Sequence, residues 1–299
     1  MDLLQKFSDV EVKDDTRITE ADKDFCKAHQ AAYDNAKSVL SELKYFWEDM
    51  VSNQGNLLSS IEQSPTLYLL NGNELRISSE KINEQIKATH SVFINQIIYH
   101  FNKTYRISIS TYEVTTALLP KQPEVNRHFD ELEEWKAYEN EMLELSLHYT
   151  DILEQIFIRL DGRNLQEQAM HELLEKCHEA AWNSHHKTPG YIRKKAVIRF
   201  SDYACSYTAR YSYEAWELTQ KMKHILQGIA HYETGSFSLI PSTISSIIGS
   251  YDLKGDFFEF PSCEKVQSIK LYKNGRVDIR FATEEYAQKF TEKYLGTVY

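Results

Sequence analysis

Residues 269 to 281 read Ile-Lys-Leu-Tyr-Lys-Asn-Gly-Arg-Val-Asp-Ile-Arg-Phe, and this stretch decides the fold of the C-terminal part of the chain. Two alternating runs flank Asn274-Gly275, a pair that readily adopts the positive φ angles of a tight turn, so the pattern predicts a β-hairpin. Alternation places Asp278 on the outward face of the hairpin. The opposite, core face carries five apolar side chains: Ile269, Leu271, Val277, Ile279 and Phe281.

A short helix is predicted directly after this hairpin. Thr283 is suited to cap its first turn, where the helix dipole favours Glu284 and Glu285. Gly296 is suited to end it. We expect three aromatic side chains of this helix to pack back on the hairpin: Tyr286, Phe290 and Tyr294.

A long amphipathic helix is predicted in the N-terminal part, capped by Thr19 and ending before Gly55. Its apolar residues recur at steps of three and four, which indicates one helical stripe. They are Phe25, Ala28, Ala32, Ala36, Val39, Leu43, Phe46, Trp47 and Met50. So long a helix is expected to pack against another long helix or a partner chain.

Further elements follow from turn and cap residues. Asn71-Gly72 predicts a hairpin between residues 67–70 and 75–77, and Ser79 is expected to cap a second helix. The core candidates of this helix are Ile82, Ile86, Val92, Phe93, Ile97 and Phe101. Residues 105–109 alternate and are predicted as a strand.

The middle and last thirds are predicted from breakers and periodicity. Pro120 and Pro123 mark a boundary, and Asp161-Gly162 turns between helices over 124–160 and 165–182. A strand is predicted over 196–200, and a helix over 213–232 with Trp216 inward, ended by Gly235 and Pro241. We therefore expect a mainly helical α+β fold with small β-hairpins. Its regions would be an N-terminal helical region (1–120), an acidic helical hairpin (121–190) and a C-terminal α+β domain (191–299).

Composition places the chain among globular proteins. Of its 299 residues, 42% are hydrophobic and 26% are charged. The first residues lack a basic stretch followed by an apolar one, and no apolar run is long enough to span a membrane, so we expect a cytoplasmic protein. Four scattered cysteines, Cys26, Cys177, Cys205 and Cys263, indicate reduced thiols rather than a disulfide framework or zinc site.

Common catalytic motifs are absent from the sequence, including G-x-S-x-G and the glycine-rich phosphate loops. A metal site is the alternative that the spacing leaves open. His171, Glu175 and His178 stand at i, i+4 and i+7, so one helix face would present all three. The second Glu-x-x-His of a di-metal site is missing, as is the second His of the zinc protease motif, so we expect an exposed polar face there.

Charge is distributed unevenly, and the net charge of −10 hides this. Residues 124–182 carry 15 acidic and 5 basic side chains, whereas residues 183–299 carry 12 acidic and 16 basic ones. An acidic helical surface is suited to occupy a basic groove on a partner. We predict that the partner-binding residues are Glu131, Glu133, Glu134, Glu139, Glu141 and Glu144, with Asp130 beside them.

A basic and aromatic segment between Tyr191 and Tyr213 is the candidate for nucleic-acid binding. Cations follow phosphates and rings stack on bases. The predicted nucleic-acid residues of this alternative are Arg193, Lys194, Lys195 and Tyr207, and the same segment holds Arg199, Arg210, Tyr203 and Tyr211. An overall pI near 5.6 argues against strong DNA affinity.

Two resemblances extend these expectations. The stretch from Val266 to Phe281, followed by a short helix, resembles the C-terminal end of an uncharacterised domain family of phages and mobile elements, sometimes found beside adenine-specific DNA methyltransferases. The match centres on an aromatic residue followed by Lys273-Asn274-Gly275 and alternating aliphatic residues, and it is looser over residues 190–296. That family implies no catalytic residues. In its size and acidic helices, the whole chain resembles phage anti-defence proteins of the anti-Gabija type, which assemble around a nuclease complex.

We therefore expect a non-enzymatic phage-type protein that binds and inhibits a bacterial anti-phage defence complex acting on DNA. The expected partner is of nuclease or helicase type, such as Gabija, and the chain is expected to be a homo-oligomer without a cofactor or membrane attachment. One alternative is a DNA-associated accessory module of a mobile element that works with a DNA modification enzyme. The other is a metal-dependent enzyme using His171, Glu175 and His178.

Overall fold

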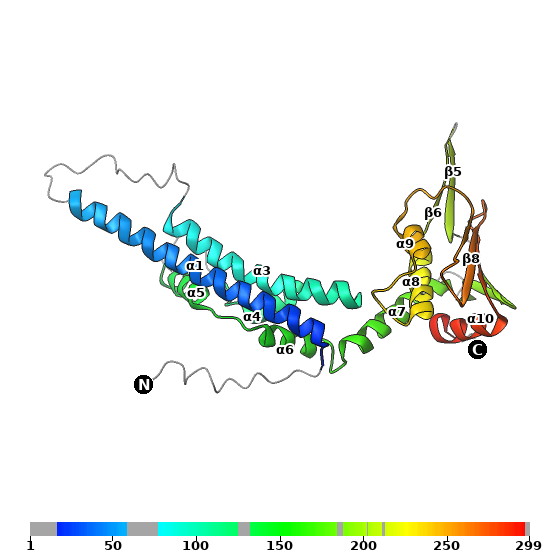
Figure 1. Cartoon of the computed structure of the whole chain (residues 1–299), viewed down its shortest axis with the longest axis horizontal. Coiled ribbons are helices and arrows are strands. Elements are labelled where there is room, and N and C mark those ends of the chain that lie inside the picture. Colours follow the sequence, from blue (N-terminus) through cyan, green and yellow to red (C-terminus); the bar gives the residue numbers. More distant parts are fainter. Residues whose placement is uncertain are drawn as a thin grey trace. The chain divides into compact units, whose positions relative to one another are not determined.

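The structure is a computed structural model that describes residues 17–58, 77–124, 132–183, 188–201, 203–210 and 213–296. The fold is mainly helical α+β, as predicted, and the chain forms two compact units (Figure 1). The N-terminal unit contains the described residues up to 102 and residues 108–164. The C-terminal unit contains residues 103–107 and the described residues from 165 onward.

The described part of the N-terminal unit is built from helices alone. They are α1 (Glu20–Leu58), α3 (Ser79–Tyr105, whose last turn groups with the C-terminal unit), α4 (Thr111–Leu118), α5 (Leu132–Glu144) and α6 (Tyr149–Arg159). Helices α1 and α3 run side by side in opposite directions (Figure 1). At the start of α1, Asp22 Oδ1 lies 2.7 Å from Nε2 of His100, and toward its other end Trp47 packs with Ile82 and Ile86.

Helix α1 begins at the residue that the sequence predicts. The Thr19 hydroxyl accepts a hydrogen bond from the Asp22 backbone N–H at 3.2 Å, and the Asp22 carboxylate accepts one from the Thr19 N–H at 3.2 Å. This reciprocal arrangement is a capping box with Asp in the place of Glu. The predicted end before Gly55 is wrong, because α1 continues through this glycine to Leu58. One glycine costs a helix only about 1 kcal/mol relative to alanine, so it does not end the helix by itself.

The connection between α5 and α6 is tied to α1 by polar side chains. Gln30 donates from Nε2 to the Leu147 carbonyl at 3.0 Å and accepts at Oε1 from the Tyr149 N–H at 2.8 Å. Lys37 Nζ donates to the carbonyl of Leu145 at 2.6 Å, and to that of Glu144 at 3.2 Å. A cation at the exposed carbonyls of a helix C-terminus is favourable, so Lys37 both caps α5 and holds it on α1.

The C-terminal unit combines helices with three small antiparallel sheets. The strands are β1 (Trp182–Asn183), β2 (Thr188–Pro189), β3 (Tyr191–Lys194), β4 (Val197–Phe200), β5 (Cys205–Arg210), β6 (Tyr213–Leu218), β7 (Phe257–Glu259), β8 (Val266–Leu271) and β9 (Val277–Phe281). The helices are α7 (Leu165–Ala181), α8 (Gln220–Thr234), α9 (Ser242–Gly249), α10 (Glu284–Phe290) and the π-helix η2 (Thr291–Leu295). The main sheet has the strand order β3-β4-β9-β8-β7.

The predicted C-terminal hairpin is confirmed. Strands β8 and β9 pair antiparallel, and Gly275 in their turn has a φ of 83°. All five predicted core-face side chains of the hairpin are buried. Thr283 caps α10 by accepting the Tyr286 N–H at 3.1 Å, and Phe290 and Tyr294 are buried against the sheet's core cluster.

Gly228 marks a close approach between two helices of this unit. A Cβ atom added there would lie 2.6 Å from Sγ of Cys177 on α7, and 3.4 Å and 3.8 Å from ring atoms of Tyr294 and Phe290. Helices α7 and α8 therefore pack at a distance that only glycine permits at position 228. The same glycine lies under the aromatic residues that attach α10 and η2.

Several local expectations need correction. Residues 213–218 form strand β6 rather than the first part of a helix, and α8 begins after Thr219, whose hydroxyl accepts the Met222 N–H. Residues 106–110 form no strand, and Val92 is exposed rather than buried in the core. The cap of α3 is Ser78, which accepts the Lys81 N–H at 3.2 Å, one residue before the predicted cap.

Other elements differ in extent. Helix α9 follows Pro241 and was not anticipated. The predicted hairpin over residues 67–77 lies almost wholly outside the described residues. The predicted acidic helical hairpin over 121–190 is divided between the two units, since α5 and α6 belong to the N-terminal unit and α7 belongs to the C-terminal one.

Candidate functional site

The outer surface of α5 carries the acidic side chains that the sequence singles out. Four of the predicted residues, Glu133, Glu134, Glu141 and Glu144, are exposed, and at 100° per residue they fall on one arc of the helix. We call these four residues the acidic face. Within the described part of the chain, none of the four carboxylates has an ion-pair partner, so their charges are not neutralised locally. Glu131 and Asp130 lie outside the described residues.

Glu139 does not share this arrangement. Its Oε1 lies 3.3 Å from Nζ of Lys87 on α3, and both side chains are partly covered. Glu139 therefore links α5 to α3 and does not belong to the exposed arc of the other four glutamates, and its role in partner binding stays a prediction.

The inner surface of α5 is fixed by one buried polar bridge. Nε2 of His90 on α3 lies 2.8 Å from the Met142 carbonyl, and Nδ1 lies 2.9 Å from the hydroxyl of Tyr33 on α1. That hydroxyl accepts the Leu147 N–H at 3.2 Å. The pattern is satisfied by a neutral His90 with its proton on Nε2. Burial lowers the pKa of His90, the hydrogen bond to the Met142 carbonyl offsets part of this, and the positive charge of Lys37 lowers the pKa further.

The three residues of the alternative metal site are not brought together with further ligands in the part of the chain that the structure describes. His171, Glu175 and His178 are all exposed on α7. Among the residues that the structure describes, no three His, Cys, Asp or Glu side chains are placed to hold a metal ion. His178 does line an open cavity of about 370 Å³, together with Glu179, Trp182 and Tyr191.

Cys26, Cys177 and Cys205 are buried, and Cys263 is half-buried. Burial raises the pKa of Cys26 and of Cys177 to about 12. Burial also raises the pKa of Cys205 and Cys263. A thiol reacts as its thiolate, so these shifts leave little of the reactive form at neutral pH.

The predicted nucleic-acid residues do not form one cluster. Lys194 pairs with Val197, which in turn pairs with Arg280 near the end of β9. Ala204, which leads into the strand that carries Tyr207, instead donates to the Gly275 carbonyl beyond the beginning of β9. Lys194 and Lys195 thus lie near one end of the main sheet, and Tyr207 lies near its other end.

Individual positions of this set add to the difference. Arg193 Nη1 lies 3.6 Å from Oε1 of Glu284 at the start of α10. The ring of Tyr207 packs on Trp216 with centroids 4.7 Å apart, and Nζ of Lys273 lies 4.4 Å from the Tyr207 centroid. Lys194 and Lys195 are exposed. The side chains of Arg210 and Tyr211 lie outside the described part.

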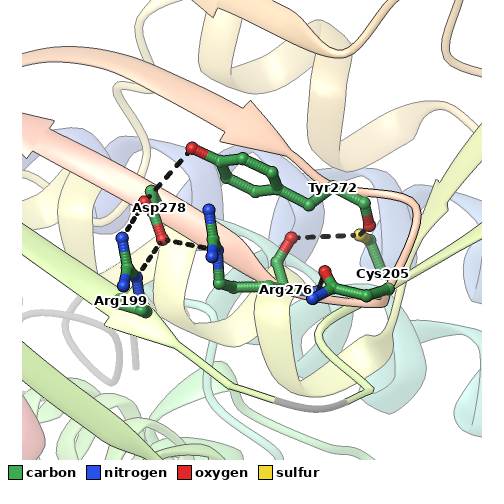
Figure 2. A network of polar contacts seen from close by, with 6 residues as sticks. Arg199, Cys205, Tyr272, Arg276 and Asp278 are labelled. Carbon is green, nitrogen blue, oxygen red and sulfur yellow. Dashed lines mark hydrogen bonds and ion pairs between the residues drawn. The ribbon is translucent and has the colours of Figure 1, made fainter.

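A charged network on the outward face of the sheet was not anticipated as a unit (Figure 2). Arg199 donates two hydrogen bonds to Asp278, from Nε to Oδ1 at 3.0 Å and from Nη2 to Oδ2 at 2.9 Å. Nε of Arg276 lies 3.3 Å from the same Oδ1, and its Cζ lies 3.6 Å from the centre of the Tyr272 ring. The Tyr272 hydroxyl donates to Oδ2 at 3.3 Å. Asp278 raises the pKa of Arg199, first through the hydrogen bonds that it accepts and then through its negative charge.

Alternation in the sequence correctly placed Asp278 on this face, since Ile279 is fully buried. The partner Arg199 lies 79 positions earlier, and only the pairing of β4 with β9 brings the two together. No pattern in the neighbouring sequence predicts a pair so far apart in the chain.

Comparison with protein-family models, with curated proteins and with solved structures gives no match for this chain. Among the described residues, no helix combines the length and apolar character needed to cross a membrane.

Proposed function

We propose that this chain is a non-enzymatic, phage-type protein that binds and inhibits a bacterial anti-phage defence complex acting on DNA. The acidic face of α5 is the contact surface in this proposal. It would occupy a basic surface on the partner that otherwise receives DNA phosphates, and the Gabija complex is the first partner to test.

The supporting observation is the state of the four glutamates in the acidic face. They are exposed on one side of a helix whose other side is fixed by His90, Lys37 and the Lys87–Glu139 ion pair. A rigid row of unpaired negative charges costs a binding partner little ordering entropy. It also attracts a positively charged surface at long range, which speeds association and selects the partner.

The experiment measures both binding and inhibition with charge-reversed protein. The triple variant Glu133→Lys, Glu134→Lys and Glu141→Lys changes exposed side chains only, so the fold is expected to persist. Binding to purified Gabija complex is followed by biolayer interferometry at several salt concentrations, and phage plating efficiency is scored on bacteria that carry Gabija. Wild-type protein is expected to bind and to restore plating. The triple variant is expected to bind at least about tenfold more weakly, with a flatter salt dependence.

A matched control changes the net charge equally at other exposed acids of the same unit. Asp24→Lys, Glu42→Lys and Glu154→Lys lie on α1 and α6, and this variant is expected to bind and inhibit as wild type does. Equal binding by the α5 variant would remove the acidic face from the proposal. Wild-type protein that neither binds the complex nor restores plating would overturn inhibition of this defence system.

A further inference from the structure

The outward face of the main sheet is a second charged surface, opposite in sign to the acidic face. Helices cover the inward face, where α8 and α10 join the sheet in one apolar cluster. Strand register defines what the outward face carries. One cross-strand row runs through Ile192, Arg199, Asp278, Lys270 and Phe257, in the order of the strands.

The neighbouring rows continue the same pattern. Lys194 and Arg280 lie in the next row toward the end of β9, with Glu259 at its β7 edge. Arg276 and Tyr272 pair in the row on the other side. Because every second residue of a strand faces the same way, successive rows are roughly 7 Å apart. Cations therefore stand at three levels along β9.

The charge of this surface is strongly positive. It carries five cations, Lys194, Arg199, Lys270, Arg276 and Arg280, against the two acids Asp278 and Glu259. Lys194 and Arg280 are exposed and have no ion-pair partner in the part of the chain that the structure describes. Asp278 neutralises only one of its two arginines. The two hydrogen bonds that Asp278 accepts also fix the orientation of the Arg199 guanidinium.

Apolar and aromatic side chains interrupt the cations. Phe257 is 50% exposed and Ile192 is 53% exposed, at the two edges of the middle row. Tyr272 lies half-buried beside Arg276. An acidic protein partner would need the cations alone. A strand of unpaired nucleotides uses both kinds of residue, because phosphates follow the cations and base faces stack on rings.

We propose that the outward face of the sheet β3-β4-β9-β8-β7 binds single-stranded nucleic acid. Lys194, Lys270 and Arg280 contact phosphates, and Phe257 offers a stacking surface for a base. Duplex DNA is disfavoured because its base faces are already stacked and cannot reach Phe257. This site lies in the C-terminal unit and does not depend on the function proposed for the acidic face.

Fluorescence anisotropy with labelled 15-nucleotide strands of oligo-dT and oligo-rU tests the site on the full chain. Both are expected to bind at low salt, and the tighter of the two identifies DNA or RNA as the source. The variant Lys194→Glu, Lys270→Glu and Arg280→Glu is expected to lose at least about tenfold in affinity. Its salt slope should fall by about 2, since each single-strand phosphate contact contributes about 0.7. Absence of measurable binding by wild type to either strand overturns the proposal.

A matched control reverses three cations on helices of the same unit, Lys221→Glu, Lys289→Glu and Lys293→Glu. This control is expected to bind as wild type does, apart from a small uniform loss from the lower net charge. A loss as large as that of the sheet variant would show an unspecific charge effect and overturn the assigned face.

The aromatic contribution is tested separately. Phe257→Ala is expected to weaken oligo-dT about tenfold, whereas Tyr251→Ala, which removes another exposed ring, should leave affinity unchanged. An abasic 15-unit strand keeps the phosphates and should not respond to Phe257→Ala. A polyglutamate peptide that binds wild type as tightly as oligo-dT would identify a general receptor for acidic chains and overturn nucleic-acid binding. The triple variant Glu133→Lys, Glu134→Lys and Glu141→Lys should bind oligo-dT at least as well as wild type. This result separates the test of nucleic-acid binding from the test of inhibition through the acidic face.

Discussion

Two short helices, α5 in the N-terminal unit and α10 in the C-terminal unit, are attached to their surroundings by different forces. Helix α5 is held by directional bonds from His90, Lys37 and Lys87, and Met142 and Leu143 of this helix pack inward. Helix α10 and the following η2 are held by buried aromatic packing, with Phe290 stacked on Tyr294 at 4.9 Å between centroids, and Nδ1 of His231 lies 2.7 Å from the Tyr294 hydroxyl. Directional bonds fix an orientation but respond to protonation, whereas packing is sensitive to volume and indifferent to pH. The Met142 carbonyl of α5 is bonded directly to the buried His90, so protonation there acts on the helix that carries the proposed partner contact.

The largest expected effect is on the packed attachment. Phe290→Ala removes a fully buried ring next to Phe281 and Tyr232 and should lower the free energy of unfolding by about 3–5 kcal/mol. Chemical denaturation measures the loss, and hydrogen exchange should localise it to α10 and the sheet. Phe290→Leu keeps most of the volume and should cost less. Equal losses from both variants would mean that α10 is not held by filled volume.

Gly228→Ala tests the same attachment from below. The new methyl group would clash with Cys177 and press on Tyr294, so we expect a loss of about 1–3 kcal/mol in stability. Gly249→Ala at the end of α9 has nothing within 4 Å of the new Cβ and should be close to neutral. A neutral result at position 228 would show that α7 and α8 separate easily, against the tight packing described.

Tyr33→Phe tests the polar attachment of α5. Loss of the hydroxyl leaves Nδ1 of His90 and the N–H of Leu147 without their partner, at a cost of about 1–3 kcal/mol. Hydrogen exchange should increase in α5 and its following loop while α10 stays protected. The matched control is Tyr45→Phe, since Tyr45 lies on α1 like Tyr33 but is 75% exposed. This variant should leave stability and hydrogen exchange unchanged. Faster exchange in α10 as well would blur the contrast between the two helices.

The parts of the fold that could be predicted are those whose signals lie close together in the sequence. The hairpin of β8 and β9 was predicted because its alternation, its Asn-Gly turn and the cap at Thr283 all lie within a short stretch. Residues 213–218 were predicted as a helix because Trp216 and Met222 fit a helical stripe. Strand β6 forms instead because β5 pairs with it over six residues, and this pairing is a tertiary effect that overrides local preference.

The candidate sites divide in the same way. Exposure of four glutamates on α5 could be predicted from helical periodicity, whereas the Lys87 partner of Glu139, 52 positions away, could not. His90 reads as one polar position in a helical stripe, and its bonds to Tyr33 and Met142 exist only once α1, α3 and α5 meet. The basic surface likewise required the register of five strands.

The smallest expected effect is a gradual dependence on pH in the attachment of α5. Burial lowers the pKa of His90 below its ordinary value near 6.5. Below that value the unfolded chain binds a proton that the folded His90 excludes, so stability falls as the pH drops from 7 toward 5. Above pH 7 both states are neutral at this position and His90 contributes no pH dependence. Urea unfolding at pH 7.5 and 5.5 measures the change.

Burial also lowers the pKa of His231 and His224, so these residues lower the stability of the chain in acid as well. The contribution of His90 is therefore measured by comparing wild type with a variant that lacks this histidine. His90→Gln removes the titration at this position. Its stability should therefore depend less steeply on pH than that of wild type, and its hydrogen exchange should differ in α5 but not in α10. If protonation of His90 loosens α5, binding through the acidic face should weaken at pH 5.5 in wild type more than in the Gln variant. Equal weakening in both would separate the partner contact from the bridge beneath it.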